Sequence, residues 1–181
     1  MEKWKVLSSK LVYDDVWFKV RQDKVELPNG KVFENYLFWQ AGDVVIIVPV
    51  TNNNEFVLVR QYRHAAQEVV IGFPGGLIDT GEAEEAAARR ELAEETGCSA
   101  ENIQFLIQVL SNPSKVTGRN LVYLATNVIQ SQAQHFDEME DIEVLVKPYK
   151  EVLEMIYRGE IKTSSTIAAT FLAIHKLGLP M

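Results

Sequence analysis

The stretch from Gly76 to Cys98, GLIDTGEAEEAAARRELAEETGC, limits the fold of this chain more than any other. The residues leading into it, Pro74-Gly75-Gly76, predict a tight glycine turn. The Ala-, Glu- and Arg-rich run that follows predicts a helix from about Glu82 to Thr96. Gly97 then predicts a helix stop in the left-handed conformation. The chain must therefore place a glycine turn directly before a strongly charged helix.

Three glutamates on this predicted helix share one face. Glu91, Glu94 and Glu95 are separated by three and four residues, so their carboxylates are neighbours and repel one another. Glu94 and Glu95 also lie in the last turn, where the helix dipole is already negative. A bound cation would reverse both unfavourable effects, and oxygen ligands of this kind suit Mg²⁺ or, as an alternative, Mn²⁺.

A solvated acidic helix is the competing explanation. The pairs Glu85–Arg89 and Arg90–Glu94 have the spacing of exposed helical ion pairs. Runs of charge usually lie on a solvated surface, so spacing alone favours this explanation over a metal site. The wider pattern decides between them.

In full, the pattern is Gly76, five residues, Glu82, seven residues, Arg90-Glu91-Leu92, one residue, Glu94-Glu95, one residue and Gly97-Cys98. It resembles the Nudix box at every fixed position, which is a highly specific match. The last position usually carries a larger aliphatic residue, and Cys98 departs mildly from that pattern. The resemblance implies an α/β fold: a Nudix α/β/α sandwich with a mixed sheet, preceded by a small N-terminal antiparallel sheet.

The resemblance also implies a set of site residues. The metal ligands are Glu91 and Glu95, with Glu94 next, together with the backbone carbonyl of Gly75 just ahead of the box. Glu82 is on the opposite side of an ideal helix from Glu91, so we expect it to orient Arg90 or to hold water. Arg90 would tie down carboxylates that otherwise repel. We count Glu94 and Arg90 among the catalytic residues.

The general base is expected outside the box, because the box glutamates are needed as ligands. Asp137, Glu138, Glu140 and Asp141 are the next acidic candidates along the chain. The segment 138–142, EMEDI, resembles the acidic loop that carries the base in ADP-ribose pyrophosphatases, and that match implies Glu140. Glu138 stays an alternative, as does an ordinary solvated loop.

Two arginines at a strand end are candidate substrate contacts. Arg60 and Arg63 lie in a Val-Arg-Gln-Tyr-Arg stretch that resembles one leading to the substrate site of sugar-nucleotide Nudix enzymes. A guanidinium group suits phosphate, although arginines at this place can also be plain surface charge.

Two further substrate contacts follow from the same resemblance. ADP-ribose-type relatives commonly carry a glutamate two residues before the proline of the glycine turn, where this chain has Gly72. Glu68 is nearby in another register and is the remaining candidate. Pro113 matches a hallmark proline about 15 residues past the box, although its neighbours Asn112 and Ser114 are not the usual ones.

The N-terminal residues 1–42 are expected to form antiparallel strands, and residues 43–181 the Nudix domain. Strands are predicted at Val16–Val20, Val25–Leu27 and Val32–Trp39, with a turn at Pro28-Asn29-Gly30. Eight aromatic residues fall in this segment, too many for a small sheet to cover by itself. They would pack on the neighbouring domain or form a subunit interface. The resemblance to ADP-ribose pyrophosphatases, which typically dimerise through N-terminal strands, implies a homodimer.

The later elements follow from apolar runs and turn residues. Asp43–Val50 and Glu55–Arg60 are almost continuously apolar, as strands buried on both faces require. Further strands are predicted at Val69–Phe73, Ile103–Leu110, Leu121–Val128 and Ile142–Val146. Two helices are predicted at the end, one after Pro148 and one capped within residues 163–166.

Composition restricts the partners. The chain has 181 residues, a net charge of −7 and a single cysteine. The acidic balance, with a pI near 5.0, argues against nucleic acid as the main partner. The start lacks the apolar core of a signal peptide and no run is long enough to span a bilayer, so no membrane partner and a cytoplasmic location are expected.

The sequence therefore predicts Mg²⁺-dependent hydrolysis of the pyrophosphate bond of ADP-ribose or nucleoside diphosphate sugars, giving a nucleoside monophosphate and a sugar phosphate. One alternative is a nucleoside triphosphate pyrophosphohydrolase. The other is a non-catalytic nucleotide-sensing Nudix module, which typically lacks the box glutamates that this chain retains.

Overall fold

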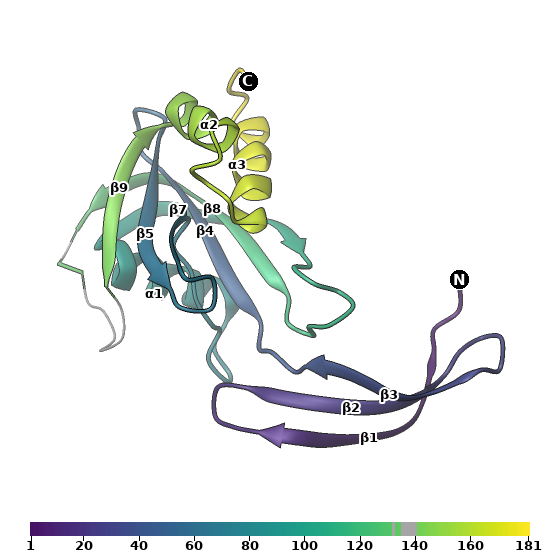
Figure 1. Ribbon diagram of the computed structural model, residues 1–181. Helices are drawn as coiled ribbons and strands as arrows, with labels where there is room; N and C mark the ends of the chain where they lie inside the picture. The colour runs from purple at the N-terminus through teal and green to yellow at the C-terminus, as the bar shows by residue number, and fades with distance from the viewer. Residues whose placement is uncertain (132, 135–140) are drawn as a thin grey trace. The chain divides into compact units, whose positions relative to one another are not determined.

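A computed structural model describes residues 1–131, 133–134 and 141–181 (Figure 1). The chain separates into two compact units. The N-terminal unit comprises Met1–Gly42 together with Leu110–Arg119, and the main unit comprises Asp43–Val109 together with Asn120–Met181. The N-terminal unit is thus built from two pieces of chain that are far apart in sequence.

The N-terminal unit is a three-stranded antiparallel sheet in the order β1-β2-β3. Its strands are β1 (Lys5–Asp14), β2 (Lys19–Glu26) and β3 (Val32–Trp39). The expected bounds of β3 and the turn at Gly30, which has φ +79°, are confirmed.

The strand predicted at Val16–Val20 is wrong in its first part. Residues 15–18 form the turn between β1 and β2, and only the last two residues of that range belong to β2. The Asp15 carboxylate accepts a hydrogen bond of 3.0 Å from the backbone N–H of Trp17. Such an Asx turn outweighs the strand preference of the β-branched and aromatic residues beside it.

The segment Leu110–Arg119 is joined to β3 by backbone hydrogen bonds. The N–H of Trp39 donates to the Lys115 carbonyl at 2.7 Å, and the N–H of Thr117 donates to the Trp39 carbonyl at 3.1 Å. Because Pro113 lies in this segment, the N-terminal sheet holds the turn that contains it.

The main unit is organised around a six-stranded mixed sheet with the order β6-β5-β4-β8-β7, and β9 pairs with β5. The β4–β8 pair is parallel, and the other pairs are antiparallel. The strands are β4 (Val44–Val50), β5 (Glu55–Arg63), β6 (Glu68–Gly72), β7 (Cys98–Val109), β8 (Asn120–Gln130) and β9 (Ile142–Pro148).

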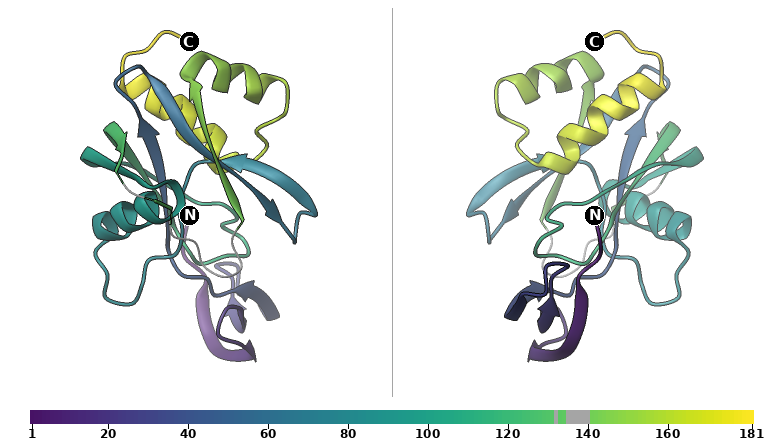
Figure 2. Two further views of the ribbon diagram at one scale, coloured as in Figure 1. Left: turned by 90° about the vertical axis from the view of Figure 1, so that its left-hand side faces the viewer. Right: turned by 90° about the vertical axis from the view of Figure 1, so that its right-hand side faces the viewer.

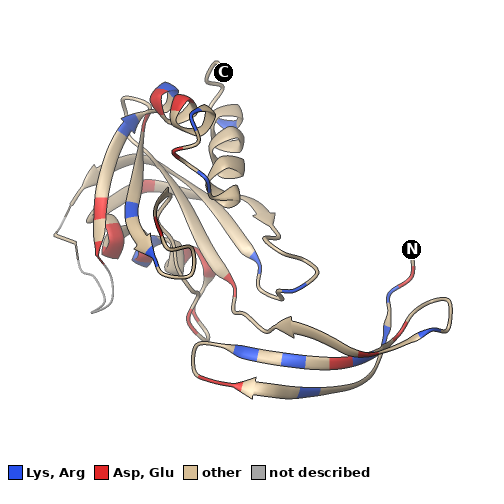
Figure 3. Ribbon diagram, in the orientation of Figure 1, with Lys and Arg blue, Asp and Glu red and all other residues tan. Residues whose placement is uncertain are grey.

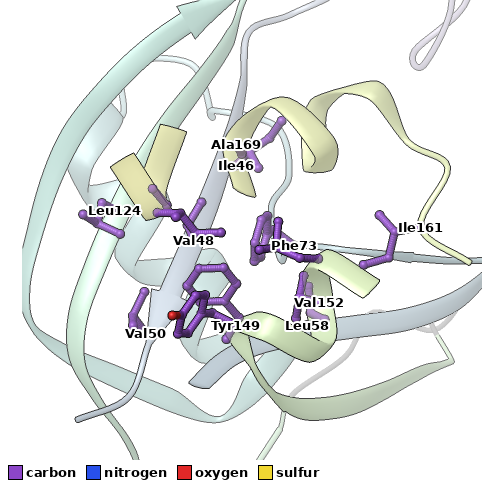
Figure 4. Close-up of a cluster of buried hydrophobic side chains, with 14 of the residues drawn as sticks. Ile46, Val48, Val50, Leu58, Phe73, Leu124, Tyr149, Val152, Ile161 and Ala169 are labelled. Carbon is purple, nitrogen blue, oxygen red and sulfur yellow. The ribbon is translucent and has the colours of Figure 1, made fainter. Parts of the chain in front are cut away.

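Helices cover both faces of this sheet, as Figures 1 and 2 show. On one face, Val45 and Ile47 of β4 belong to the same buried cluster as Leu92 of α1 (Glu84–Thr96). On the other face, alternate β4 residues such as Val48 pack with α2 (Tyr149–Tyr157) and α3 (Ser164–Lys176), including Val152 and Ala169 (Figure 4). The predicted α/β/α sandwich is confirmed.

Strands β4 and β5 separate after their connecting hairpin, where Val50 pairs with Phe56. The glycine turn lies along β4 instead: the N–H of Ile47 donates to the Pro74 carbonyl and that of Val45 to the Gly76 carbonyl, both at 2.9 Å. A Cβ at Gly75 would lie 2.1 Å from the Val45 carbonyl oxygen, so only glycine allows this approach.

Helix α1 begins at Glu84, two residues later than expected from the sequence. Glu82 is held in a preceding turn, where its N–H donates to the Asp79 carbonyl at 3.0 Å and its carboxylate accepts from the Asp79 N–H at 3.1 Å. The helix ends as predicted at Gly97, whose φ of 68° is left-handed. No helix in residues 1–131, 133–134 and 141–181 is both long and apolar enough for a bilayer crossing.

Candidate active site

The glycine turn and the acidic helix touch each other. The backbone N–H of Gly75 donates to the Glu95 carboxylate at 2.9 Å, and Glu95 is only 3% exposed. A Cβ at Gly76 would lie 2.4 Å from a carboxylate oxygen of Glu91, so a side chain at this position would displace that carboxylate. The fold therefore brings two of the predicted ligand carboxylates directly against the turn.

Arg90 lies at the centre of the carboxylates. Its guanidinium donates to both oxygens of Glu82, at 3.0 and 2.9 Å, and to Glu91 at 2.7 Å and Glu94 at 3.1 Å. A further bond of 3.0 Å runs to the Leu77 carbonyl ahead of the helix. One cation thus bridges three acidic side chains and the turn.

These contacts move the pKa values of both partners. Hydrogen bonds from Arg90 lower the pKa of Glu82, and the N–H of Asp79 adds to that effect. Chiefly through Glu82, and then through Glu91 and Glu94, the carboxylates raise the pKa of Arg90. Arg90 therefore stays protonated throughout the physiological pH range.

Glu82 is placed differently from the expectation. We expected it on the far side of the helix from Glu91, but it precedes the helix and reaches Arg90 from the turn. Its contact with Arg90 agrees with the orienting role expected from the sequence.

The carboxylates are suited to a divalent cation by their chemistry. In the described ranges, no three His, Cys, Asp or Glu side chains converge closely enough for a metal cage. Instead, Glu91 and Glu94 turn toward Arg90, while Glu95 turns toward the N–H of Gly75. Carboxylate oxygens beside a backbone carbonyl are nevertheless the donor set that Mg²⁺ and Mn²⁺ prefer.

The two candidate arginines of β5 lie on different sides of that strand. Arg60 forms an ion pair of 2.5 Å with Glu143 of β9 and lines a surface hollow with Asp141. Arg63 lines a different cavity, together with Gly72. A separation of three residues on a strand puts side chains on opposite faces, so one ligand group cannot contact both arginines in the same way.

The remaining candidates are dispersed. Glu68 is exposed at the start of β6 and forms an ion pair with Lys162. Pro113 belongs to the N-terminal unit, whereas the other described candidates belong to the main unit. Glu140 and Glu138 lie outside the described residues.

Comparison with known proteins decides the family. The model of the NUDIX domain matches residues 40–165 of this chain. The chain belongs to the Nudix family. Residues 4–36 also match the model of the nucleoside diphosphate sugar hydrolase N-terminal domain.

Relatives in this family cover nearly the whole chain. A protein named methanol dehydrogenase activator, from Bacillus methanolicus, is 30% identical over 91% of this chain and 89% of its own length. An ADP-ribose pyrophosphatase from Mycobacterium tuberculosis is 32% identical over 95% of this chain and 83% of its own. The crystal structure of an ADP compounds hydrolase aligns with a TM-score of 0.85 at 25% identity, covering 98% of this chain and 96% of the other.

Sequence reasoning missed one part of the site region. Hydroxyl groups from residues 163–166 line the cavity next to Arg63, whereas the sequence indicated only a helix cap. Thr163 is the residue before α3, but its side chain makes no cap hydrogen bond and donates instead to the Thr166 hydroxyl at 2.7 Å. A run of Ser and Thr before a helix is so common that it gives no signal of a cavity.

Proposed function

We propose that this protein hydrolyses the pyrophosphate bond of ADP-ribose or of nucleoside diphosphate sugars in a Mg²⁺-dependent reaction. Water adds to one phosphorus atom and the bridging P–O bond breaks. The products are a nucleoside monophosphate and a sugar phosphate, and the protons of the water are released. The observation that carries the proposal is the group of three helix carboxylates beside the glycine turn: Glu91 and Glu94 bind Arg90, and Glu95 accepts a hydrogen bond from the N–H of Gly75.

Family membership and the names of the relatives support this substrate class. The main unit matches the NUDIX domain, and the N-terminal strands match a domain described for nucleoside diphosphate sugar hydrolases. Two of the relatives reported above are named for ADP-ribose or ADP compounds.

Each side chain has a defined task in this proposal. Glu91, Glu95 and Glu94, with the Gly75 carbonyl, would hold Mg²⁺, which when bound neutralises the diphosphate and acidifies water. Arg90 keeps the carboxylates together through its bonds to Glu91 and Glu94, which limits their mutual repulsion. Because Arg90 already binds several carboxylates, its task is positioning and not substrate contact.

Substrate binding and proton removal are assigned to other residues. Arg63 would bind the substrate from its cavity, while Arg60 is engaged with Glu143 and would have to leave that ion pair. Glu68 and Pro113 remain proposed contacts. We propose Glu140 as the general base, on the resemblance of its acidic loop to that of ADP-ribose pyrophosphatases, with Glu138 as the alternative.

We also propose that the protein is a homodimer joined through β1–β3. Large apolar side chains are exposed on these strands and their turn, among them Trp17 at 76% and Phe33 at 52%. An apolar surface of this kind marks an interaction site. The cytoplasmic location predicted from the sequence is part of the same proposal.

A substrate panel tests the function. ADP-ribose, GDP-mannose, other nucleotide sugars and nucleoside triphosphates would each be incubated with Mg²⁺ or Mn²⁺, and the products identified by chromatography. Release of a nucleoside monophosphate and a sugar phosphate from the nucleotide sugars is expected. Exclusive turnover of triphosphates would replace the proposal with the pyrophosphohydrolase alternative, and turnover of none would favour a sensing module.

A further inference from the structure

A small cavity opens beside the glycine turn, where β4 and β5 separate. It has a volume of about 210 Å³. It is lined from β4, β5, β6, β8 and the start of α3, by Val44, Ile46, Val59, Gln61, Arg63, Val70, Gly72, Phe73, Gly75, Asn120, Thr163, Ser165 and Thr166. Gly75 connects the cavity to the proposed metal site, because its N–H binds Glu95. A ligand whose diphosphate lies at the turn can therefore extend into the cavity.

The described residues that line the cavity offer a positive charge and hydrogen-bond donors. Among the described residues that line the cavity, Arg63 is the only charged one, and none of them carries a carboxylate. The other polar groups are the hydroxyls of Thr163, Ser165 and Thr166 and the amides of Gln61 and Asn120. Hydroxyl and amide groups can donate hydrogen bonds to an anion, and a guanidinium can do so with two parallel bonds.

The opposite side of β5 provides a contrast. There Arg60 is neutralised by Glu143 at 2.5 Å, and Asp141 lines the same hollow. Arg63, by contrast, makes no ion pair within residues 1–131, 133–134 and 141–181. Two arginines three residues apart are therefore in opposite electrostatic settings, and only one has its charge available to a ligand.

Gly72 keeps the polar end of the cavity open. A Cβ at this position would lie 3.1 Å from the Thr166 hydroxyl oxygen and 3.7 Å from that of Thr163, so a longer side chain would enter the polar end. Thr166 is held in place by the N–H of Phe73 at 3.4 Å as well as by Thr163. The wall is thus fixed, and the identity of residue 72 controls what fits.

Size further restricts the ligand. Pockets for drug-sized ligands usually measure about 300–1,000 Å³, and this cavity is smaller. It suits one sugar-sized group and is too small for a second nucleoside. A neutral sugar presents hydroxyl donors that are best matched by carboxylates, and the lining residues that the structure describes include none.

We propose that this cavity selects nucleoside diphosphate derivatives whose distal sugar carries a negative charge, with Arg63 and Gly72 as the specificity-determining residues. The inference rests on the proposed function for the position of the diphosphate. It goes beyond that function in naming an acidic or phosphorylated sugar as the preferred leaving half.

The test is a binding measurement that does not require turnover. Glucuronic acid 1-phosphate, glucose 1,6-bisphosphate and glucose 1-phosphate would be titrated into the full-length protein with Mg²⁺ in a calorimeter. Glucuronic acid 1-phosphate and glucose 1,6-bisphosphate, which carry a second anionic group, are expected to bind at least tenfold more tightly than glucose 1-phosphate, as one added charge-assisted hydrogen bond allows. The order of the two anionic sugars then identifies carboxylate or phosphate as the preferred group.

Substitutions at Arg63 and Gly72 test whether these residues cause the preference. Arg63→Gln should abolish the preference and Arg63→Lys should retain part of it, while Lys176→Gln, at the exposed end of α3, should leave it unchanged. Gly72→Gln and Gly72→Glu should both weaken binding of all three sugars, because either side chain enters the polar end, but only Gly72→Glu should abolish or reverse the preference. Thermal melts would establish that each variant is folded.

Different outcomes would overturn this inference and the proposed hydrolase function. Equal affinity for the three sugars, or an Arg63→Gln variant that weakens all of them equally, would overturn the inference and leave hydrolysis standing. A protein that prefers the anionic sugars but hydrolyses no nucleotide sugar would overturn the proposed function alone.

Discussion

The apolar side chains of β4 and of the first half of β5 are almost completely buried in the main unit, whereas β1 and β3 of the N-terminal unit expose most of theirs. Val45 and Phe56 are both 0% exposed, while Leu11 is 44% and Phe33 is 52% exposed. Both regions are rich in β-branched and aromatic residues, so composition does not explain the difference. Helices cover both faces of the main sheet, and no helix belongs to the N-terminal unit as the structure describes it.

The charged residues follow a similar division. In the main unit, α1 carries acidic and basic residues along its length, whereas α3 carries almost none (Figure 3). Both helices contribute buried residues to the core, but only α1 also presents the charged side chains of the proposed chemistry. The main unit thus covers both faces of its sheet with helices and carries the proposed metal ligands, while the described N-terminal unit contains no helix and leaves large apolar side chains exposed.

The largest effect is expected from the helix carboxylates. Glu91→Gln and Glu95→Gln should each abolish most Mg²⁺-dependent turnover, because each removes a proposed ligand, while the oligomeric state is unchanged. Steady-state kinetics at saturating metal and sedimentation would measure both. Glu101→Gln, an exposed site on β7, is the matched control. Near-wild-type activity in either ligand variant would count heavily against the assignment.

The next effect concerns the proposed base. Glu140→Gln should reduce kcat by about 10²–10⁴ with metal binding largely kept, because a positioned base contributes on that scale. Glu138→Gln should reduce kcat much less. If Glu138→Gln lost most of its kcat and the kcat of Glu140→Gln stayed within a few-fold of the wild type, the general base would be reassigned to Glu138. If neither substitution reduced kcat, the general base would have to be one of the glutamates of the Nudix box.

A third prediction addresses the uncovered sheet. Phe33→Glu should convert the dimer into a monomer at micromolar concentration, because the substitution puts a charge on the proposed apolar interface. Val146→Glu makes the same change at an exposed strand position of the main unit and should remain dimeric. Sedimentation velocity distinguishes the two. A wild-type protein that sedimented as a monomer would reject the interface altogether.

The smallest effect is a pH-dependent change in stability. Arg90 lowers the pKa of Glu82 in the folded state. The ionised Glu82 therefore adds to the free energy of unfolding, fully above the ordinary glutamate pKa of about 4.3. This added stability is lost as the pH falls through the lower pKa of the folded state. Glu82→Gln should therefore lower Tm at neutral pH, and the difference should narrow below about pH 4. A Tm difference that did not change with pH would show that Glu82 acts through packing and not through its charge.

Local signals predicted much of the fold. The helix stop at Gly97 and the turn at Gly30 were readable because left-handed residues are nearly always glycine in such places. Strand β1 was not delimited, because its apolar residues fall in adjacent pairs such as Val6 and Leu7 and show no clear alternation. The turn at Asp15 was missed because side-chain hydrogen bonding competed with strand propensity.

The candidate site could be predicted only in part from the sequence. The contact of the glycine turn with Glu91 and Glu95 follows from a motif that is continuous in sequence. The cavity beside Arg63 does not, because its lining comes from five separate elements and no local pattern brings Gln61, Asn120 and Ser165 together. Strand alternation alone could have separated Arg60 from Arg63, and that signal was available in the sequence.

The two-piece construction of the N-terminal unit restricts how this protein can be rebuilt. Trp39 is hydrogen-bonded to Lys115 and Thr117, so a chain that starts at Asp43 would leave those backbone groups without their partners. A chimera that exchanged the first 42 residues with those of a relative would have to exchange Leu110–Arg119 as well. A single crossover between residues 42 and 110 therefore separates two pieces that have to fit each other, and exchanging only these two pieces requires three crossovers, after residues 42, 109 and 119.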